Sequence, residues 1–431
     1  MSTRLVNVDR NTPMLLPPDL RDWVREDDLV HFIIDALAVL DLSMARVNQR
    51  GTGDEQYPPS MMLGLLIYCY AQGIFSSRQI ERATHQNVSV RYLAANTHPD
   101  HDTIAKFRRE NAALIRSVFV ELLRLAQASG LLRLGTVALD GTKIGAAAAK
   151  RKNLTYEQLQ AQIGELNTQV AGLLERAEAA DQAGSCDEQL PTELAKAQMR
   201  RARLMAAKAE LEKQVRHKFQ QREQQREEAP PECKRRRLDP QPRKEDRVNL
   251  SDTESALTRT RSGFIQGYNG QWAMGVESGL IVAADVVRDT NDRQQLQPMV
   301  NEVVRNVGTP KHVLVDTDYE NVIQLATVEA STGTIVLCPP RRSDDVNPQT
   351  KKRRWRLASK AYREQMRQRL ATEAGRALYR LRQTTIEPGF GIIKAALGFR
   401  SFRLRGLENV RTEWALISLA FNCRRLAARK A

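Results

Sequence analysis

Apolar residues between positions 1 and 130 recur at helical spacing rather than in the alternating pattern of strands. A double proline opens the stretch 60–71, which is apolar on nearly all sides and predicts a helix at the centre of the local core. A capping box starts a short helix at Ser76, and another helix is expected to begin near Asp102. Short helices with tight polar joints indicate an all-α domain that resembles a helix-turn-helix unit.

A second pattern, short apolar runs bounded by turn residues, begins at Thr136 and predicts strands. The first strand is expected at 136–139, with Asp140-Gly141 behind it as a turn. The later elements are expected as strands at 263–274 and 279–287, a helix at 294–306, a strand at 312–315, a helix at 321–330, a strand at 334–338, and helices to the C-terminus. This order predicts a mixed α/β sheet with helices packed on it.

The segment between the first two of these strands has a coiled-coil pattern. Its apolar residues recur at alternating steps of four and three. They are Leu159, Ile163, Leu166, Val170 and Leu173. A second apolar series follows a break at 181–191, so residues 155–222 are predicted to form an antiparallel helical hairpin. Residues 223–250 are rich in Gln, Glu, Arg and Pro and are expected to be disordered.

Length and composition fit a multidomain globular protein. The chain has 431 residues, enough for two or three domains. We expect a helical domain at 1–130, a sheet-containing domain at 131–154 plus 251–431, and an inserted segment at 155–250. The five cysteines show no Cys-x-x-Cys pair, which argues against a disulfide framework or a structural zinc site. No run is long enough to span a membrane, no signal peptide is recognisable, and the protein is expected in the cytoplasm.

The charge points to a polyanionic partner. Lys and Arg number 66 against 51 Asp and Glu, a formal charge of +15. The basic residues cluster, as at Lys234–Arg237, which favours a phosphate backbone over a general solubility charge. In the N-terminal helices, five basic side chains could face phosphates: Arg78, Arg82, Lys106, Arg108 and Arg109. The alternative, that they are the solvated faces of an ordinary helical domain, stays open.

Three acidic residues carry the candidate chemistry. Asp140 and Asp316 each end an apolar run, and Glu387 follows Thr384-Thr-Ile. Hard divalent cations such as Mg²⁺ prefer carboxylate and phosphate oxygens, and paired ions can stabilise both oxygens of an in-line displacement. If the two strands are adjacent, both aspartates emerge at one edge of the sheet. We therefore expect Asp140 to bridge two Mg²⁺ or Mn²⁺ ions, with Asp316 and Glu387 each completing one side.

Glu387 is predicted to lie in the first turn of a helix. Thr384 or Thr385 suits the N-cap, and Pro388 suits a first turn because its missing N–H costs little there. Glu387 and Lys394 then share one helix face, so Lys394 can reach a phosphate beside a metal. Each acidic residue also has a structural alternative: Asp140 in a turn, Asp316 as a helix cap, and Glu387 in a capping box.

With these motifs, the chain resembles the DDE transposases of bacterial insertion sequences, over nearly its whole length. The matching motifs are Asp140-Gly-Thr-Lys143, Leu314-Val-Asp-Thr-Asp-Tyr319, the hairpin Arg261–Gln271, and the Tyr379, Arg382, Glu387, Lys394 signature. Two departures are visible. Asp318 stands where the family usually has glycine, and Arg382 lies one residue farther from Glu387 than in the commonest spacing.

The resemblance implies an RNase H-like catalytic core that binds double-stranded DNA with terminal inverted repeats. It implies metal-dependent strand cleavage, attack of the freed 3′-hydroxyl on target DNA, and a homo-oligomer on DNA. Asp140, Asp316 and Glu387 would be catalytic metal ligands, Lys143, Arg382 and Lys394 would contact DNA phosphates, and Tyr379 would pack or hydrogen-bond. The alternatives are a non-catalytic DNA-binding protein or repressor derived from a transposase, and a metal-dependent nuclease that does not join strands.

Overall fold

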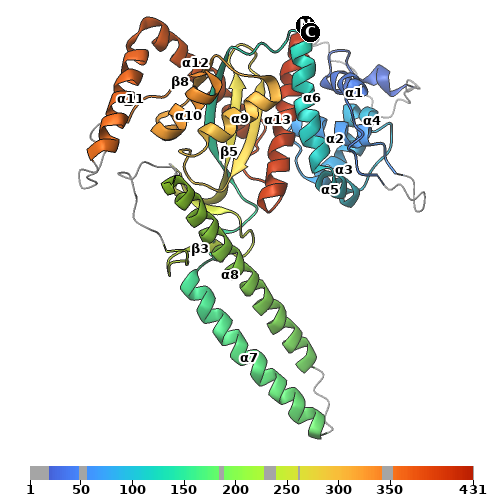
Figure 1. Ribbon diagram of the computed structural model, residues 1–431. Helices are drawn as coiled ribbons and strands as arrows, with labels where there is room; N and C mark the ends of the chain where they lie inside the picture. The colour runs from blue at the N-terminus through green and yellow to red at the C-terminus, as the bar shows by residue number, and fades with distance from the viewer. Residues whose placement is uncertain are drawn as a thin grey trace, which may run out of the picture.

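The computed structural model describes residues 19–47, 56–183, 189–227, 239–260, 263–341 and 353–430 (Figure 1). Its N-terminal part is helical, as predicted. The helices there are η1 (Leu20–Trp23), α1 (Leu29–Val39), α2 (Pro59–Ala71), α3 (Ser77–Gln86), α4 (Val88–Leu93), α5 (His101–Glu110) and α6 (Ala112–Ala128). Helix α2 is buried continuously from Met62 to Ala71. Asp28 and Asp100 cap α1 and α5 through their carboxylates.

A mixed sheet forms the second part of the molecule. Its strands are β1 (Thr136–Gly145), β4 (Ala256–Thr260), β5 (Gly263–Gly275), β6 (Ile281–Val287), β7 (His312–Leu314) and β8 (Ile335–Leu337). The path runs β4-β5-β1-β7-β8, and β6 also pairs with β5. The β6, β5 and β1 pairings are antiparallel, whereas β1, β7 and β8 are parallel. This is the predicted RNase H-like α/β arrangement.

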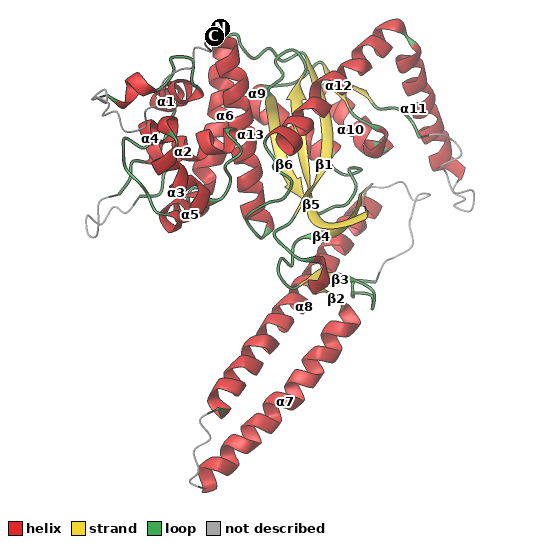
Figure 2. Ribbon diagram, turned by 180° about the vertical axis from the view of Figure 1, so that it is seen from behind, coloured by secondary structure: helices red, strands yellow, loops and turns green. Residues whose placement is uncertain are grey.

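Helices cover both faces of the sheet. Helices α9 (Leu296–Val307) and α10 (Val322–Thr332) lie in front of it in Figure 1. Helices α12 (Glu373–Gly391) and α13 (Leu407–Lys430) lie on the other side, with α11 (Arg353–Ala371) beside them (Figure 2). Trp272 of β5 stacks on both Phe390 and Trp414, with ring centroids 4.9 Å apart in each pair. This aromatic contact fixes α12 and α13 against the sheet.

Two sequence predictions about this region are wrong. Asp140-Gly141 is not a turn, because β1 continues to Gly145 and pairs with β5 over its length. Glu387 is not in the first turn of its helix. Helix α12 begins after Thr372, whose hydroxyl accepts from the Gly375 N–H, so Pro388 lies inside the helix. A π-helical turn at Ile392–Ala396 then continues the chain.

The insert between β1 and β5 is a helical hairpin, as predicted. Helices α7 (Tyr156–Ala183) and α8 (Leu190–Glu227) project from the body of the protein (Figures 1 and 2). Their seam buries Leu159, Leu166, Val170 and Leu173. At the base of the hairpin, β2 (Asn153–Thr155) pairs with β3 (Arg247–Asn249), after the short η2 turn (Lys150–Lys152).

The expectation of disorder at 223–250 is wrong in part, because α8 extends to Glu227 and β3 is ordered by pairing with β2. The cluster Lys234–Arg237 lies outside the described residues. The division of the chain at residues 130, 154 and 250 stays a prediction.

The last helix joins the N-terminal helices to the sheet. Helix α13 contacts α2, α6 and β6, and one buried apolar cluster extends across all of them. A polar chain crosses this boundary. Arg108 donates to the Tyr70 hydroxyl (2.8 Å), which donates to Glu413 (3.2 Å). Glu413 also accepts the backbone N–H groups of Arg403 and Leu404, so its buried charge is compensated on each side.

Among the described residues, we find no helix that is both long enough and apolar enough to cross a bilayer.

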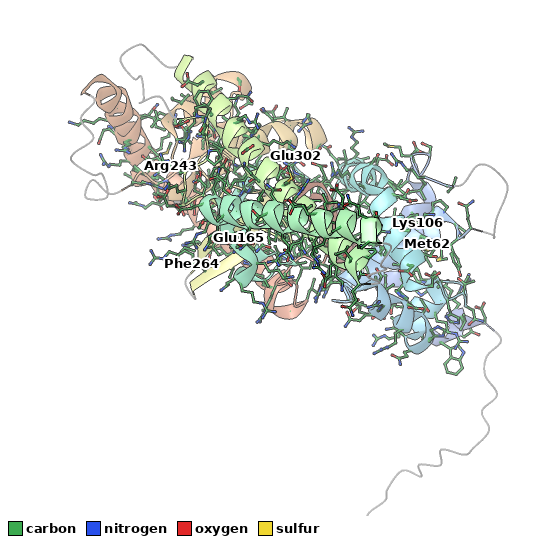
Figure 3. The ribbon with its side chains drawn as sticks, turned by 90° about the horizontal axis from the view of Figure 1, so that it is seen from below. Met62, Lys106, Glu165, Arg243, Phe264 and Glu302 are labelled. Atoms are coloured by element: carbon green, nitrogen blue, oxygen red, sulfur yellow. The ribbon has the colours of Figure 1, made fainter. Side chains whose placement is uncertain are left out.

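Glu302, on α9 (Figure 3), gives a stability prediction. Burial, followed by the nearby Asp285, raises the pKa of Glu302 to about 7 from 4.5. The folded state therefore binds this proton more tightly than the unfolded state, and stability falls as pH rises through that interval. Glu302→Gln removes the penalty. The unfolding free energy of Glu302→Gln should exceed that of the wild type by a difference that grows by roughly 2 kcal/mol from pH 5 to pH 8.

Thermal unfolding of both proteins at the two pH values measures the effect. The matched control is Glu165→Gln, on the hairpin helix α7 (Figure 3), where the wild-type carboxylate is exposed. An equal gain for Glu302→Gln at both pH values would show that the ionised carboxylate is not penalised.

Candidate active site

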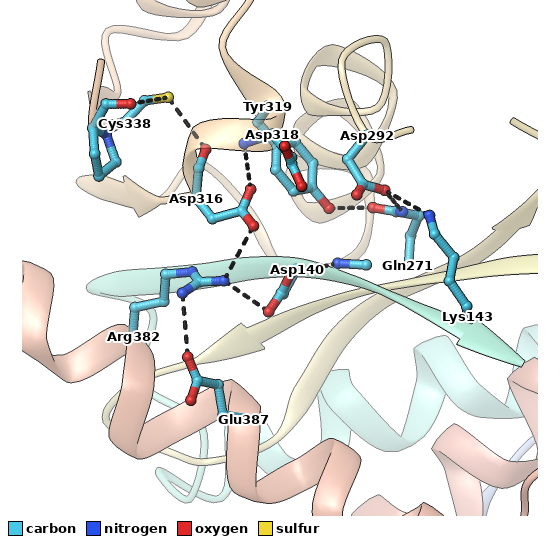
Figure 4. A network of polar contacts seen from close by, with 12 residues as sticks. Asp140, Lys143, Gln271, Asp292, Asp316, Asp318, Tyr319, Cys338, Arg382 and Glu387 are labelled. Atoms are coloured by element: carbon cyan, nitrogen blue, oxygen red, sulfur yellow. Dashed lines mark hydrogen bonds and ion pairs between the residues drawn. The ribbon is translucent and has the colours of Figure 1, made fainter. Parts of the chain in front are cut away.

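Three carboxylates from distant parts of the sequence converge on one arginine (Figure 4). Asp140 lies in β1, Asp316 follows the adjacent parallel strand β7, and Glu387 lies near the end of α12. The Arg382 guanidinium is 2.8 Å from Asp140, 3.7 Å from Asp316 and 3.4 Å from Glu387. The predicted adjacency of the two strands is confirmed, since Ala138 pairs with Leu314.

Burial shifts the pKa values of the charged groups in this cluster. Arg382 is 7% exposed, and its charge faces the mostly buried Asp140 and Asp316 and the exposed Glu387. Burial raises the pKa of Asp140 to about 7, against the opposing effect of Arg382. Burial also raises the pKa of Asp316. Burial alone would lower the pKa of Arg382, but Asp140 and Asp316 outweigh it and the pKa rises. The Arg382 cation therefore favours the ionised forms of Asp140 and Asp316 against the effect of burial.

The donor set suits a hard divalent cation, because carboxylate oxygens are its preferred protein ligands. As it stands, no group of three or more His, Cys, Asp or Glu side chains in the described ranges has the arrangement of a metal site. The guanidinium of Arg382 lies between the three carboxylates instead. A cation already holds these side chains together, and a divalent ion would meet three oxygen donors if Arg382 moved aside.

Lys394 lies on the same side of β1 as Asp140. Its ammonium donates to the Thr142 hydroxyl (2.6 Å) and the Lys143 carbonyl (3.1 Å). Burial lowers the pKa of Lys394, and Asp140 opposes this. Glu387 and Lys394 were predicted to share a face of a helix that begins near Thr384, but α12 begins at Glu373. The spacing of seven residues still brings both to the Asp140 side of the sheet.

Lys143 points to the opposite face of β1. Its ammonium is 3.9 Å from Asp292, which accepts the side-chain amides of Asn269 and Gln271 at 2.6 Å each. Sequence reasoning missed Asp292, Asn269 and Gln271 as parts of this region. No sequence signal marks them, because only the register of β5 against β1 places Gln271 opposite Gly141 and Asn269 opposite Lys143.

Asp318 and Tyr379 lie at the edge of the cluster. The Asp318 side chain is 68% exposed and pairs with Arg341 at 3.4 Å, and its backbone N–H donates to Asp316. Its carboxylate thus points towards Arg341 rather than Arg382. Tyr379 packs against the main apolar cluster, and burial raises the pKa of its hydroxyl to about 12.

The basic residues predicted in the N-terminal helices divide into two groups. Arg78 and Arg82 on α3 and Lys106 and Arg109 on α5 are exposed. Arg108 is 4% exposed and donates to the Tyr70 hydroxyl and the Phe75 carbonyl. The expectation that Arg108 reaches a phosphate is therefore wrong, because its guanidinium forms hydrogen bonds within the protein core.

Comparison with known families agrees with this architecture. A family model described as "Transposase domain (DUF772)" matches residues 18–110, the N-terminal helices. A second, described as "Transposase DDE domain", matches residues 335–427, which include Arg382, Glu387 and Lys394. No curated protein and no solved structure matches the chain. The two transposase models, one at each end of a chain with an RNase H-like core, support a DDE transposase of the insertion-sequence type.

Proposed function

We propose that this transposase binds the terminal inverted repeats of its element, cuts the DNA there and joins the freed 3′-hydroxyl to target DNA. The observation that carries the proposal is the convergence of Asp140, Asp316 and Glu387 on one cation, Arg382. A cluster of three carboxylates, two of them mostly buried, is a poor choice for stability alone. It is well suited to holding divalent ions against phosphate oxygens.

Asp140, Asp316 and Glu387 would hold Mg²⁺ or Mn²⁺. The bound ions would activate the attacking oxygen and stabilise the leaving one. Arg382 and Lys394 would neutralise and position phosphates around the scissile bond, which is the main task of a protein in phosphoryl transfer. Lys143 is left out of this role, because its ammonium is buried beside Asp292 on the opposite face of β1.

The exposed face of the N-terminal helices would contact the duplex. Arg78 and Arg82 lie four residues apart on α3, and α5 beside it carries Lys106 and Arg109. Together with the net charge of +15, these side chains support binding to the phosphate backbone. We place the DNA-binding unit at residues 1–130 and the catalytic unit at 131–154 with 251–431. The likeness to transposases also supports a homo-oligomer on DNA.

The test is incubation of the full-length protein with a linear duplex that carries the flanking inverted repeats, a plasmid target and Mg²⁺. We expect cleavage at the repeat end, a free 3′-hydroxyl and covalently joined product. Cleavage without joining would instead identify a nuclease. A shifted but uncut duplex would identify a DNA-binding protein without catalysis.

Arg382 gives a prediction about metal affinity. Because its guanidinium contacts the proposed ligands, it competes with a divalent cation in the absence of DNA. Arg382→Gln should therefore bind Mn²⁺ at least about tenfold more tightly than the wild type, measured by calorimetry. Lys394→Gln is the matched control, since it removes the same charge from a side chain that contacts Thr142 rather than a carboxylate. Equal gains for the two variants would mean that Arg382 does not compete directly.

A further inference from the structure

A second polar cluster lies on the far side of β1 from Arg382 (Figure 4). Asp292, in the loop between β6 and α9, is 7% exposed. One of its carboxylate oxygens accepts both Asn269 and Gln271, and Lys143 approaches the same oxygen at 3.9 Å. Within the described residues, the Lys143 ammonium is buried and has no hydrogen-bond partner. We call Lys143, Asn269, Gln271 and Asp292 the Asp292 cluster.

The cluster is linked to the turn that carries Asp316. The buried Tyr319 donates its hydroxyl to the side-chain carbonyl of Gln271. Tyr319 ends the short turn η4 (Thr317–Tyr319), and Asp316 caps that turn by accepting the Asp318 N–H at 2.9 Å. A chain of hydrogen bonds thus runs from Asp292 through Gln271 and Tyr319 to the residues directly after Asp316.

The Asp292 cluster also packs closely against β1, the strand that carries Asp140. A Cβ atom at Gly141 would lie 2.4 Å from the Gln271 amide nitrogen and 2.5 Å from the Asp292 carboxylate. Such distances leave no room for a side chain. Gly141 is therefore required so that the Asp292 cluster can pack directly on the backbone next to Asp140. The Asp292 cluster thus packs on β1 at Gly141 and, through Gln271, is bonded to Tyr319 in the turn after β7.

We propose that Asp292 is a positioning residue that acts through Gln271 and Tyr319 to fix the Asp316 turn relative to Asp140. This inference rests on the proposed function, in which the two aspartates share bound metal. A buried carboxylate is costly, and an apolar side chain would stabilise this loop more simply. A chain of hydrogen bonds has the advantage that it specifies one geometry, which metal ligands require.

Tyr319→Phe tests the chain with little change in shape, because it removes only the hydroxyl that bonds Gln271. Outer-shell partners of metal ligands typically contribute about 10–100-fold in metal affinity, so Mn²⁺ affinity should fall at least about tenfold. The matched control is Tyr268→Phe. Tyr268, on β5, is as fully buried as Tyr319 and donates its hydroxyl to Asp252 at 2.8 Å rather than to Gln271. Both variants should lose similar thermal stability, but only Tyr319→Phe should lose affinity for Mn²⁺.

Asp292→Asn supplies a second measurement, because it keeps the shape and removes the charge. It should also weaken Mn²⁺ binding, and the double variant Tyr319→Phe/Asp292→Asn should lose little more than the worse single variant. Such non-additivity is expected when two residues act through one chain. The inference is overturned if Tyr319→Phe and Tyr268→Phe bind Mn²⁺ equally, or if the two effects simply add. A wild type that binds no Mn²⁺ would overturn the proposed function together with this inference.

Discussion

Asp140→Asn is expected to abolish cleavage of repeat-end DNA while DNA binding stays nearly unchanged. Asp140 is central to the carboxylate cluster, and its substitution removes one charge without changing the side-chain shape. Substitution of a residue that only supports a metal ligand typically lowers metal affinity or activity about 10–100-fold. Loss of Asp140, a proposed ligand itself, should therefore lower the cleavage rate by more than about a hundredfold. Fluorescence anisotropy of the labelled repeat and quantified cleavage under single-turnover conditions measure the two properties separately.

The matched control is Asp318→Asn, which removes an aspartate from the motif that carries Asp316. Its carboxylate is directed to Arg341 at the surface, so this variant should cut at close to the wild-type rate. If Asp140→Asn cuts as fast as Asp318→Asn, Asp140 is not part of the catalytic centre. If Asp140→Asn loses binding and cleavage together, its role is in folding or DNA contact rather than catalysis.

Arg108→Met is expected to be the most destabilising substitution among the basic residues of the N-terminal helices. It removes the donor to Tyr70 and leaves Glu413 buried without its compensating positive charge. Breaking a buried charge pair by removing one partner typically costs about 3–5 kcal/mol. Chemical denaturation should show a correspondingly lower midpoint, because α5, α2 and α13 meet at this chain.

Arg109→Met provides the comparison, since the adjacent side chain is exposed and should change the unfolding free energy by less than about 0.5 kcal/mol. Adding Glu413→Gln to Arg108→Met should restore part of the loss, because it removes the uncompensated carboxylate. Equal midpoints for the Arg108 and Arg109 variants would show that the Arg108–Tyr70–Glu413 chain contributes nothing to stability.

The sequence was informative where local pattern and tertiary structure agree. Apolar runs before Asp140 and Asp316 predicted two strands, and the structure places those strands side by side. The coiled-coil spacing likewise predicted the hairpin, because its two helices bury their apolar seams mainly against each other. In both cases the periodicity of a short segment determines which side chains are buried.

Prediction failed where contacts between distant segments override a local signal. Thr384, Thr385 and Pro388 have the composition of a helix start, but the helix begins at Thr372 and continues through them, with Phe390 stacked on Trp272. Arg108 and Arg109 are indistinguishable in sequence, and only the fold shows that Arg108 is linked to Glu413 through the Tyr70 hydroxyl. Asp292 gave no signal because its partners lie on another strand, more than twenty residues earlier in the chain.

The central claim is that Asp140, Asp316 and Glu387 together bind the divalent ions that cut DNA. The most direct measurement uses complexes of the wild type and of Glu387→Gln with repeat-end DNA that is uncut at the start. Mn²⁺ binding and DNA cleavage are then measured in the same samples. We predict that the wild type binds Mn²⁺ and cuts, and that Glu387→Gln loses both while it still holds the DNA. Wild-type Mn²⁺ affinity in Glu387→Gln, or wild-type cleavage that persists in excess EDTA, would contradict the claim.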